Sequence, residues 1–371
     1  MTNILVTGAN GFIGKNLVLA LGRVPDTMVI STDIDTPDAE LTCGLDAADV
    51  VFHLAGVNRP QNEGDFVTGN VGSLEKLLAG LELRKRRPLL VLSSSTQALL
   101  DNPYGISKRR AEKVLLEYAA RTGTRTRIFR LPGVFGKWCR PNYNSVVATF
   151  CYNIARGIPI QMSDPSKEIE IVHVDDLIDT FIKVMQDQSE GPPFIEVIPS
   201  FRIALGELAE ILGGFRKIRE TLRLRDLSDP LSRRLFGTYV SYLPLDGFSY
   251  NVKYKLDERG VLAELLKADG HGQIFVSRTK PGVTRGNHYH NVKVEKFVVL
   301  EGDALIRFRH MSTDETAQYA VSGTQFRIID IPPGWTHSIE NLGPGEMVAL
   351  FWSSEVFDSA RSDTYAAEVL K

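Results

Sequence analysis

Hydrophobic and polar positions follow two different rhythms along the chain. Up to about residue 245, short apolar runs alternate with longer segments in which apolar residues recur every three or four positions. The predicted strands are 3–8, 49–56, 88–95 and 124–136, and the predicted helices are 11–22, 70–83 and 104–123. Strands that alternate with helices are typical of a parallel sheet with helices on both faces. The first part of the chain therefore predicts a doubly wound α/β domain.

From about residue 250 the rhythm changes to short strands separated by Gly, Pro and Asn. The last predicted helix is 261–268, and the predicted strands around and after it are 272–279, 295–302, 303–310, 325–334 and 346–352. Short strands at even spacing with turn signals between them are typical of a small antiparallel barrel or sandwich. The boundary falls within 225–250, and we expect domains at 1–245 and 246–371.

Length and charge limit the classes of protein that this chain fits. A chain of 371 residues exceeds the size of one typical core, which agrees with two domains. The net charge of −2 provides no electrostatic attraction for nucleic acid or for an anionic membrane, so we expect neither partner. The basic run at 84–88 ends a predicted helix, and we interpret it as a solvated helix end.

The cysteines and the apolar runs bear on the compartment. Cys43, Cys139 and Cys151 are odd in number and widely spaced, which argues against a disulfide framework and fits a reducing compartment. The first strand follows Met1 almost at once without a signal-like segment, and no apolar run approaches the roughly 18–20 residues of a membrane span. We therefore expect a cytoplasmic protein.

A glycine-rich turn joins the first predicted strand to the first predicted helix. In "TGANGFIG" the glycines are Gly8, Gly11 and Gly14. A sharp turn, a close approach of backbone N–H groups to a pyrophosphate, and tight packing of the helix on the sheet each favour glycine. Such a motif alone is weak evidence, but the strand before it and the helix after it support a dinucleotide-binding site.

The predicted helix at 104–123 begins with a tyrosine and a lysine on one face. Tyr104 and Lys108 are four residues apart, so their side chains are neighbours. An ammonium group beside a phenol favours the phenolate, and we expect it to lower the pKa of Tyr104. A hydroxyl from the serines at 93–95 would orient a substrate carbonyl. A surface Tyr/Lys pair is the alternative interpretation, which the preceding glycine turn and serine strand weaken.

Six segments of residues 1–245 resemble, in order, the extended short-chain dehydrogenase/reductases that act on nucleotide-linked sugars; they are "TGANGFIG", "VFHLAG", "LSSS", "YGISK", "RLPGVFG" and "IVHVDDL". The resemblance implies a Rossmann-type fold, Tyr104 as proton donor or acceptor, Lys108 on the nicotinamide ribose and Ser95 as the hydroxyl. Only eight residues separate Ser95 from Tyr104, so Ser94 and Thr96 remain alternatives. The implied cofactor-binding residues are Gly8, Gly11, Phe12, Ile13, Gly14, Asp33, Leu54, Ala55, Tyr104 and Lys108.

The choice of cofactor rests on two opposed indications. Asp33 lies in "VISTDID" at 29–35, near the end of a further strand between the first predicted helix and the strand at 49–56. A carboxylate there accepts hydrogen bonds from a ribose 2′-hydroxyl and repels a 2′-phosphate, which favours NAD. Lys15 and Arg59 are the cations that we considered for a 2′-phosphate. The family resemblance implies NADPH as the reductant, so we expect NADPH rather than NADH.

The second predicted domain contains a cluster of potential metal ligands. His288 and His290 alternate along a predicted strand and would point to one side, while Glu295 and His337 could supply two further ligands. Three imidazoles and a carboxylate suit a divalent transition metal. Exposed histidine pairs also occur by chance, but five of the seven histidines lie within 271–371. We therefore predict a metal site at these four residues.

The spacing in this region resembles the two motifs of the cupin barrel; the matching residues are Gly282, His288, His290, Glu295 and Gly302, then Pro332, Gly334, His337 and Asn341. The second motif departs in having Gly323 nine residues before Pro332 instead of a glycine six before it. The resemblance implies an all-β cupin barrel with zinc. "LDERG" at 256–260 resembles the start of cupin-fold epimerases that act on 4-keto nucleotide sugars.

The whole chain is similar to the bifunctional enzymes that make UDP-N-acetyl-6-deoxy-L-talose, the precursor of UDP-N-acetyl-L-fucosamine in bacterial capsule and O-antigen. This resemblance implies a UDP-linked 4-keto-6-deoxy amino sugar as substrate. A C4 ketone acidifies the C3 proton, so our hypothesis is that the barrel inverts C3 before the first domain reduces C4. The epimerase base remains open among Lys293, Lys296, Tyr289 and a water on the metal. We also expect a homodimer.

Two rival hypotheses remain open at this point. In the first, only the reductase is catalytic, and the barrel is a metal-stabilised dimerisation module. In the second, the protein is a non-enzymatic sensor of nucleotide sugars that uses the dinucleotide only for binding.

Overall fold

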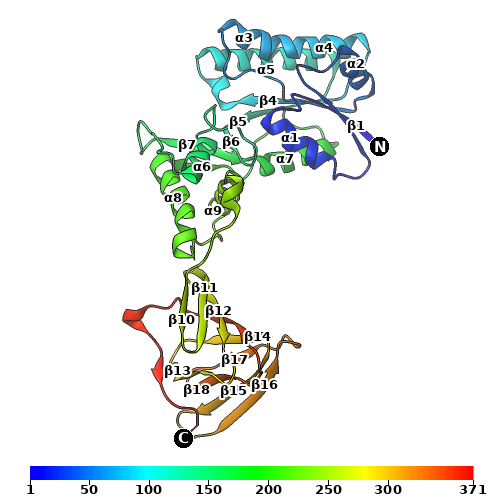
Figure 1. Cartoon of the computed structure of the whole chain (residues 1–371). Helices are drawn as coiled ribbons and strands as arrows, with labels where there is room; N and C mark the ends of the chain where they lie inside the picture. Colours follow the sequence, from blue (N-terminus) through cyan, green and yellow to red (C-terminus); the bar gives the residue numbers. More distant parts are fainter. Residues whose placement is uncertain (371) are drawn as a thin grey trace. The chain divides into compact units, whose positions relative to one another are not determined.

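The computed structural model describes residues 1–370, which form two compact units (Figure 1). The first unit comprises 1–212 and 233–243, and the second comprises 213–232 and the chain from Pro244 onward. The domain definition 1–245 and 246–371 stays a prediction. No helix within residues 1–370 has both the length and the apolarity needed to cross a membrane.

The first unit contains a five-stranded parallel sheet in the order β2-β1-β3-β4-β5. These strands are β1 Thr2–Thr7, β2 Thr27–Thr32, β3 Val50–His53, β4 Leu89–Ser95 and β5 Thr126–Leu131. Because β1 lies between β2 and β3, the chain reverses its direction across the sheet there, and ligands of such sheets bind at the carboxyl ends of the strands near this point. The glycine-rich turn follows β1 directly.

Helices cover both faces of this sheet (Figure 1). The helices are α1 Phe12–Leu21, α2 Asp38–Ala47, α4 Ser73–Leu83, α5 Pro103–Thr122 and α7 Val174–Gln186. Leu17 and Phe181 of α1 and α7 belong to the core on one face, whereas Leu78 and Leu115 of α4 and α5 belong to the core on the other. Burial on both faces explains why β3 and β4 read as continuous apolar runs. The doubly wound Rossmann-type prediction is confirmed.

A second, smaller sheet and several further helices complete the chain up to Ser241. A three-stranded sheet has the order β6-β7-β8. The bounds are α3 Gly64–Val67, η1 Thr68–Gly72, η2 Thr96–Leu99, β6 Gly133–Phe135, α6 Val146–Arg156, β7 Glu168–His173, β8 Phe201–Ala204, α8 Leu205–Thr221 and α9 Pro230–Ser241.

The second unit is built from two sheets of short strands (Figure 1). One has the order β10-β11-β12-β19-β14-β17 with β9 beside β11, and the other has the order β16-β15-β18-β13-β20. The bounds are β9 Arg223–Leu224, η3 Leu245–Phe248, β10 Tyr254–Asp257, β11 Gly260–Ala268, β12 Gly272–Thr279, β13 Thr284–Tyr289, β14 Glu295–Glu301, β15 Asp303–His310, β16 Thr316–Ser322, β17 Ile329–Ile331, β18 Trp335–Asn341, β19 Met347–Ser353, η4 Ser359–Arg361 and β20 Tyr365–Ala366. Phe297, Ile306, Ile339 and Phe351 form part of their shared core. The predicted all-β fold of this part is confirmed.

Two predicted elements of this unit are wrong. The helix predicted at 261–268 is strand β11, which pairs with β12 along its length. A shift of register between Glu264 and Leu266 interrupts the strand alternation, so the apolar positions imitate a helical period. The strand predicted at 325–334 is restricted to Ile329–Ile331, because turn hydrogen bonds precede it and Pro332 has no N–H to donate.

Candidate active site and metal centre

The glycine turn after β1 approaches the end of β3 at a distance that no side chain would allow. Gly8 has a φ of 71°, and a Cβ there would lie 2.6 Å from the Ala55 nitrogen. A Cβ on Gly14 would lie 2.2 Å from the Gly8 oxygen. No side chain of residues 1–370 caps α1, so the N–H groups of its first turn, at Phe12 and Ile13, are available to a phosphate. These residues fit a dinucleotide.

Asp33 lies beside this turn at the end of β2. One oxygen of its carboxylate accepts a hydrogen bond from the Asn10 N–H at 2.8 Å, and the other accepts one from the Ile34 N–H at 2.8 Å. Leu54 is joined to the end of β1 by a hydrogen bond from its N–H to the Thr7 oxygen. Asp33 is therefore held where a cofactor ribose would bind, and its charge opposes a 2′-phosphate. Arg59, one of the cations considered for that phosphate, lies over the Tyr143 ring.

The fold brings Tyr104, Lys108 and Ser95 together at the carboxyl end of β4. Tyr104 is in the first turn of α5, which Asn102 caps by accepting a hydrogen bond from the Gly105 N–H at 2.8 Å. The Lys108 ammonium donates to the Ser93 oxygen at 3.1 Å and lies 5.9 Å from the centre of the Tyr104 ring. The Ser95 hydroxyl lies close enough to the Tyr104 side chain to act on the pKa of its phenol. This arrangement can donate a proton to a carbonyl oxygen.

The prediction that Lys108 lowers the pKa of Tyr104 is wrong for this structure. Burial raises the pKa of Tyr104, and the nearby Ser95 hydroxyl offsets only part of that effect. Burial also lowers the pKa of Lys108 to about 8, although the Glu112 charge acts in the opposite direction. A raised pKa keeps the phenol protonated at neutral pH, which suits a proton donor.

The two alternatives to Ser95 have other environments. The Ser94 hydroxyl donates to the buried carboxylate of Glu112, which also pairs with Arg130 at 2.7 Å. Thr96 begins η2 and is exposed. Of the three hydroxyls, Ser95 is the one that meets Tyr104.

Sequence reasoning missed Asn70, which supports the backbone beside this site. The buried Asn70 amide bonds both the N–H and the carbonyl of Val57 at 2.9 Å and donates to the Ser107 hydroxyl at 3.0 Å. It thereby ties the segment after β3 to α5. No local pattern in the sequence marks this role, because all of its partners are distant along the chain or belong to another element.

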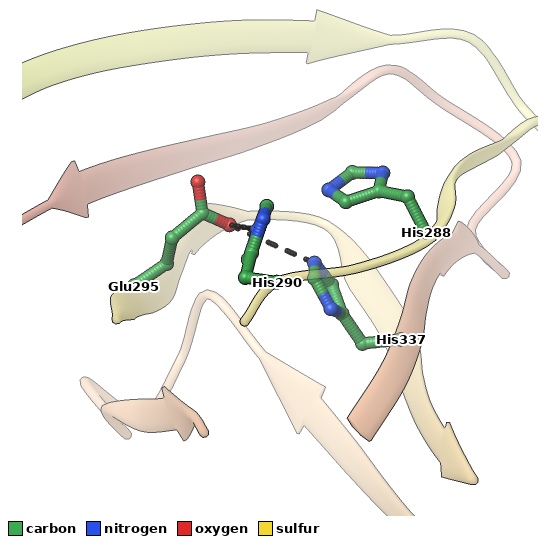
Figure 2. A group of neighbouring side chains, drawn as sticks. All are labelled: His288, His290, Glu295 and His337. Carbon is green, nitrogen blue, oxygen red and sulfur yellow. Dashed lines mark ion pairs between the residues drawn. The ribbon is translucent and has the colours of Figure 1, made fainter. Parts of the chain in front are cut away.

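The second unit brings His288, His290, Glu295 and His337 together, as Figure 2 shows. One potential ligand atom from each of these residues lies within 4.8 Å of those of the other three. A Glu295 oxygen lies 3.3 Å from Nε2 of His290 and 3.6 Å from Nε2 of His337. All four predicted ligands therefore point at one small volume.

The chemistry of these side chains fits a divalent metal. His290 and His337 are almost fully buried, yet Nε2 of each has no hydrogen-bond partner within residues 1–370, and Nδ1 of His337 has none either. Burial, then the neighbouring imidazoles, lowers the pKa of His288 to about 4, which favours the neutral, metal-binding form. Burial alone would raise the pKa of Glu295, but the adjacent imidazoles of His290 and His337 hold it well below its usual range. Neutral imidazoles around a carboxylate are a typical transition-metal ligand set.

The regular strand predicted through His288 and His290 is wrong in detail. The pairing of β13 with β18 shifts between Gly286 and His288, Asn287 has a φ of 56°, and β13 ends at Tyr289. His290 lies just beyond the strand, where its Nδ1 hydrogen-bonds the Asp363 backbone oxygen. A bulge and a tertiary contact, rather than simple alternation, place the two imidazoles.

Asp363 is a further supporting residue that sequence reasoning missed. Its carboxylate accepts hydrogen bonds from three successive backbone N–H groups, of Asn291, Val292 and Lys293, at 2.8–2.9 Å for the shortest of each. Burial alone would raise its pKa, but these bonds lower it to about 2. Asp363 thus fixes the turn that carries His290, from 73 residues away.

Of the residues considered as an epimerase base, both lysines have polar partners, whereas the tyrosine makes a contact through its ring. The Lys293 ammonium donates to the Thr364 hydroxyl at 2.9 Å. Lys296 follows Glu295 in β14, so it points to the opposite face, where it pairs with Asp330. The Tyr289 ring stacks on the Tyr365 ring.

Comparison with protein-family models now adds an independent result. Residues 4–197 match the NAD dependent epimerase/dehydratase family, and residues 255–365 match the polysaccharide biosynthesis C-terminal domain. The chain belongs to the NAD-dependent epimerase/dehydratase family. The first unit of this epimerase/dehydratase contains the glycine turn and Tyr104, and its second unit contains the cluster of potential metal ligands.

Individual relatives match this epimerase/dehydratase over nearly its full length. It is 43% identical over 366 residues, 99% of this chain and 98% of the relative, to the UDP-2-acetamido-2,6-beta-L-arabino-hexul-4-ose reductase of Pseudomonas aeruginosa. The crystal structure of the capsular polysaccharide assembling protein CapF from Staphylococcus aureus is 42% identical, with a TM-score of 0.92, over 99% of this chain and 100% of that one. These relationships confirm the predicted class and the prediction that the protein is an enzyme.

More distant structures share the fold of the first unit alone. UDP-glucuronic acid 4-epimerase from Bacillus cereus in complex with NAD is 19% identical, with a TM-score of 0.52, over 57% of this chain and 83% of that one. At this identity the match supports the α/β fold alone.

Proposed function

We propose that this protein is a bifunctional nucleotide-sugar enzyme. Its barrel epimerises C3 of a UDP-2-acetamido-2,6-dideoxy-4-hexulose, and its α/β unit reduces C4 with NADPH. The product is UDP-N-acetyl-6-deoxy-L-talose, the precursor of UDP-N-acetyl-L-fucosamine. The observation that carries the proposal is the presence of two differently equipped sites in one chain, with a tyrosine, serine and lysine in one and three histidines and a glutamate in the other.

The reductase half rests on the residues at the end of β4 and the start of α5. Bound NADPH supplies a hydride to C4. Tyr104, protonated at neutral pH, gives its proton to the C4 oxygen, while the nearby Ser95 hydroxyl orients that oxygen through a hydrogen bond. Lys108 holds the nicotinamide ribose. The name of the Pseudomonas aeruginosa relative, a hexul-4-ose reductase, supports this half.

NADPH is the proposed cofactor although Asp33 argues for NADH. The carboxylate of Asp33 would repel a 2′-phosphate, unless cations near the turn compensate. Initial rates with each cofactor test this part. We expect the larger kcat/KM with NADPH, and a larger value with NADH would reassign the cofactor without changing the rest of the proposal.

The epimerase half must act first, because reduction removes the ketone that acidifies the C3 proton. His288, His290, Glu295 and His337 would hold a zinc ion. Bound zinc is a Lewis acid that can polarise an oxygen or link strands structurally. Lys293 and Lys296 have other partners, so Tyr289 and a water on the metal stay open as the base.

Deuterium uptake and reduction together test the proposal. The protein is incubated with the UDP-linked 4-keto sugar in deuterated water, with and without NADPH, and the nucleotide sugars are analysed by mass spectrometry after return to ordinary water. We expect one deuterium at C3 without NADPH, and a reduced product carrying that deuterium when NADPH is present. Replacing Tyr104 with Phe should slow NADPH oxidation about 10²- to 10⁴-fold and leave deuterium uptake intact.

Other outcomes select a rival hypothesis. Reduction without C3 exchange would mean that the reductase alone is catalytic and that the barrel is a metal-stabilised dimerisation module. Absence of turnover with every 4-keto UDP-sugar would favour a non-enzymatic sensor. A homodimer and a cytoplasmic location remain predictions that accompany the proposal.

A further inference from the structure

Arg285 shares the interior face of the barrel with the metal ligand His288. In a regular strand, residues three apart point to opposite faces. Here the irregularity at Asn287 brings Arg285 and His288 back to the same face of the sheet. Arg285 pairs with Ile339, and His288 pairs with His337. Ile339 and His337 are two apart in the regular strand β18, and both are buried. Arg285 and His288 therefore occupy neighbouring positions on one face.

The guanidinium of Arg285 is held from one side. Its Nε donates to the Thr279 hydroxyl at 2.9 Å, and that hydroxyl lies 3.4 Å from the Ser277 hydroxyl. Thr279 and Ser277 are both buried in β12. Because the buried Thr279 side chain can rotate little, its hydrogen bond fixes the orientation of the Arg285 guanidinium.

On its other side the guanidinium has a donor that makes no hydrogen bond within residues 1–370. The Arg285 side chain is only 11% exposed, and its buried Nη2 makes no hydrogen bond within residues 1–370. The nearest anionic group is the Asp257 carboxylate at 3.9 Å, too far for a hydrogen bond, and it is already bonded by Arg259. A buried cation with an N–H group that makes no hydrogen bond is unfavourable unless a ligand accepts that hydrogen bond.

We propose that Arg285 is the oxyanion-binding residue of the barrel. Its Nη2 donates a hydrogen bond to a negatively charged oxygen of the nucleotide sugar, either O4 of the enolate or a phosphoryl oxygen. This inference rests on the proposed epimerase function. It assigns Arg285 a direct contact with substrate and gives Thr279 the role of a positioning residue.

Inversion at C3 passes through an enolate. A base takes the C3 proton, the electrons of the C–H bond form the C3–C4 double bond, and the carbonyl π electrons move to O4. Arg285 donates to that oxyanion. The electrons on O4 then re-form the carbonyl while C3 takes a proton on its other face. A preorganised donor in a buried site stabilises such a developing charge strongly.

The test compares C3 deuterium uptake without NADPH in the wild-type protein, Arg285→Gln and Arg285→Lys. Arg278→Gln is the matched control, because Arg278 is exposed on the opposite face of β12 from Thr279 and lies 3.8 Å from Glu346. Bound metal per chain and the unfolding temperature are measured for each variant. Added guanidinium is tested for rescue of Arg285→Ala.

We expect Arg285→Gln to lower the exchange rate about 10²- to 10³-fold with metal retained, and guanidinium to restore part of the rate in Arg285→Ala. A fall in kcat identifies the enolate oxygen as the ligand, whereas a rise in KM at constant kcat identifies a phosphoryl oxygen. Arg278→Gln should match the wild type.

Three results would overturn the inference. If Arg285→Gln exchanges C3 deuterium at the wild-type rate, the role of Arg285 is contradicted while the proposed epimerase function stands. The same holds if its exchange rate falls only in proportion to a loss of bound metal. Absence of exchange in the wild-type protein sinks the proposed epimerase function and this inference with it. The two failures are therefore distinguishable.

Discussion

At the scale of single residues, burial shifts the two titrating groups of α5 toward their neutral forms. Tyr104 has a raised pKa, and Lys108 has a pKa lowered to about 8, each chiefly because a charged form is poorly solvated there. Spacing along the helix indicates that the two groups are neighbours, but the sign of each shift depends on what surrounds them. The Tyr104 phenol is thus kept protonated at neutral pH, and the Lys108 ammonium is held near its point of deprotonation.

The lowered pKa of Lys108 predicts the pH dependence of reduction. As pH rises through about 8, the ammonium loses its proton and becomes a weaker donor to a ribose hydroxyl, while Tyr104 stays protonated. We expect kcat/KM for C4 reduction to be highest below pH 8 and to fall above it. A profile of initial rates from pH 6 to 10 checks this, and a flat profile up to pH 9.5 would contradict it.

The same shift has a consequence for stability. Between about pH 8 and the usual lysine pKa near 10.4, the unfolded chain binds a proton at Lys108 that the folded chain does not, so this group's contribution to the free energy of unfolding rises with pH. The difference in unfolding free energy between the wild type and Lys108→Met at pH 7 and pH 9.5 isolates that contribution.

At the scale of secondary-structure elements, irregularities position the chemistry of the barrel. The bulge of β13 puts Arg285 and His288 on one face, and a turn held by Asp363 places His290 beyond the strand end. Gly286 makes the bulge possible, with a φ of 103° and with β18 close against it. A β-bulge beside a site is a common way to redirect a side chain.

This element-scale role predicts different effects for two glycine substitutions. A Cβ on Gly286 would lie 2.6 Å from the His337 oxygen, whereas one on Gly282, which has a φ of 70°, would meet nothing within 4 Å. We expect Gly282→Ala to cost about 1–2 kcal/mol from backbone strain alone. Gly286→Ala should cost more and lower the metal content, because it pushes β13 away from His337.

Urea unfolding and metal analysis of both variants check this prediction. Equal stability losses in Gly282→Ala and Gly286→Ala, each with full metal content, would show that the close approach of β13 and β18 does not shape the metal cluster.

At the scale of the whole molecule, the chain has separate cores. The first unit has a core on each face of its parallel sheet, and the second has its own core between two antiparallel sheets. The cofactor turn belongs to the first unit and the metal cluster to the second. Each ligand should therefore stabilise mainly the unit that binds it.

Calorimetry of the full chain tests this independence. A chelator should lower the unfolding transition of the barrel only, and restoring metal to 1,000 times its Kd should return about 4 kcal/mol. NADPH should raise only the transition of the α/β unit, which serves as the matched control. Movement of both transitions on adding either ligand would mean that the units unfold together.

Features that depend on local spacing could be predicted from the sequence. Apolar periodicity indicated the parallel sheet and the change to an all-β domain. Glycine spacing indicated the nucleotide turn, and the four-residue step from Tyr104 to Lys108 put both on one helix face. The kinds of ligand atom in the four potential metal ligands could also be predicted, because imidazole and carboxylate chemistry does not depend on the fold.

Features that depend on long-range partners could not be predicted from the sequence and are seen first in the folded chain. Pairing with β12 makes β11 a strand despite its helical pattern, and proximity to Tyr104 distinguishes Ser95 from its neighbours. The supporting roles of Asn70 and Asp363, and the unused donor of Arg285, come from contacts with segments far along the chain. The periodicity of the sequence limits which face of a helix or strand a side chain can occupy. Strand register, bulges and burial decide which residues that side chain contacts.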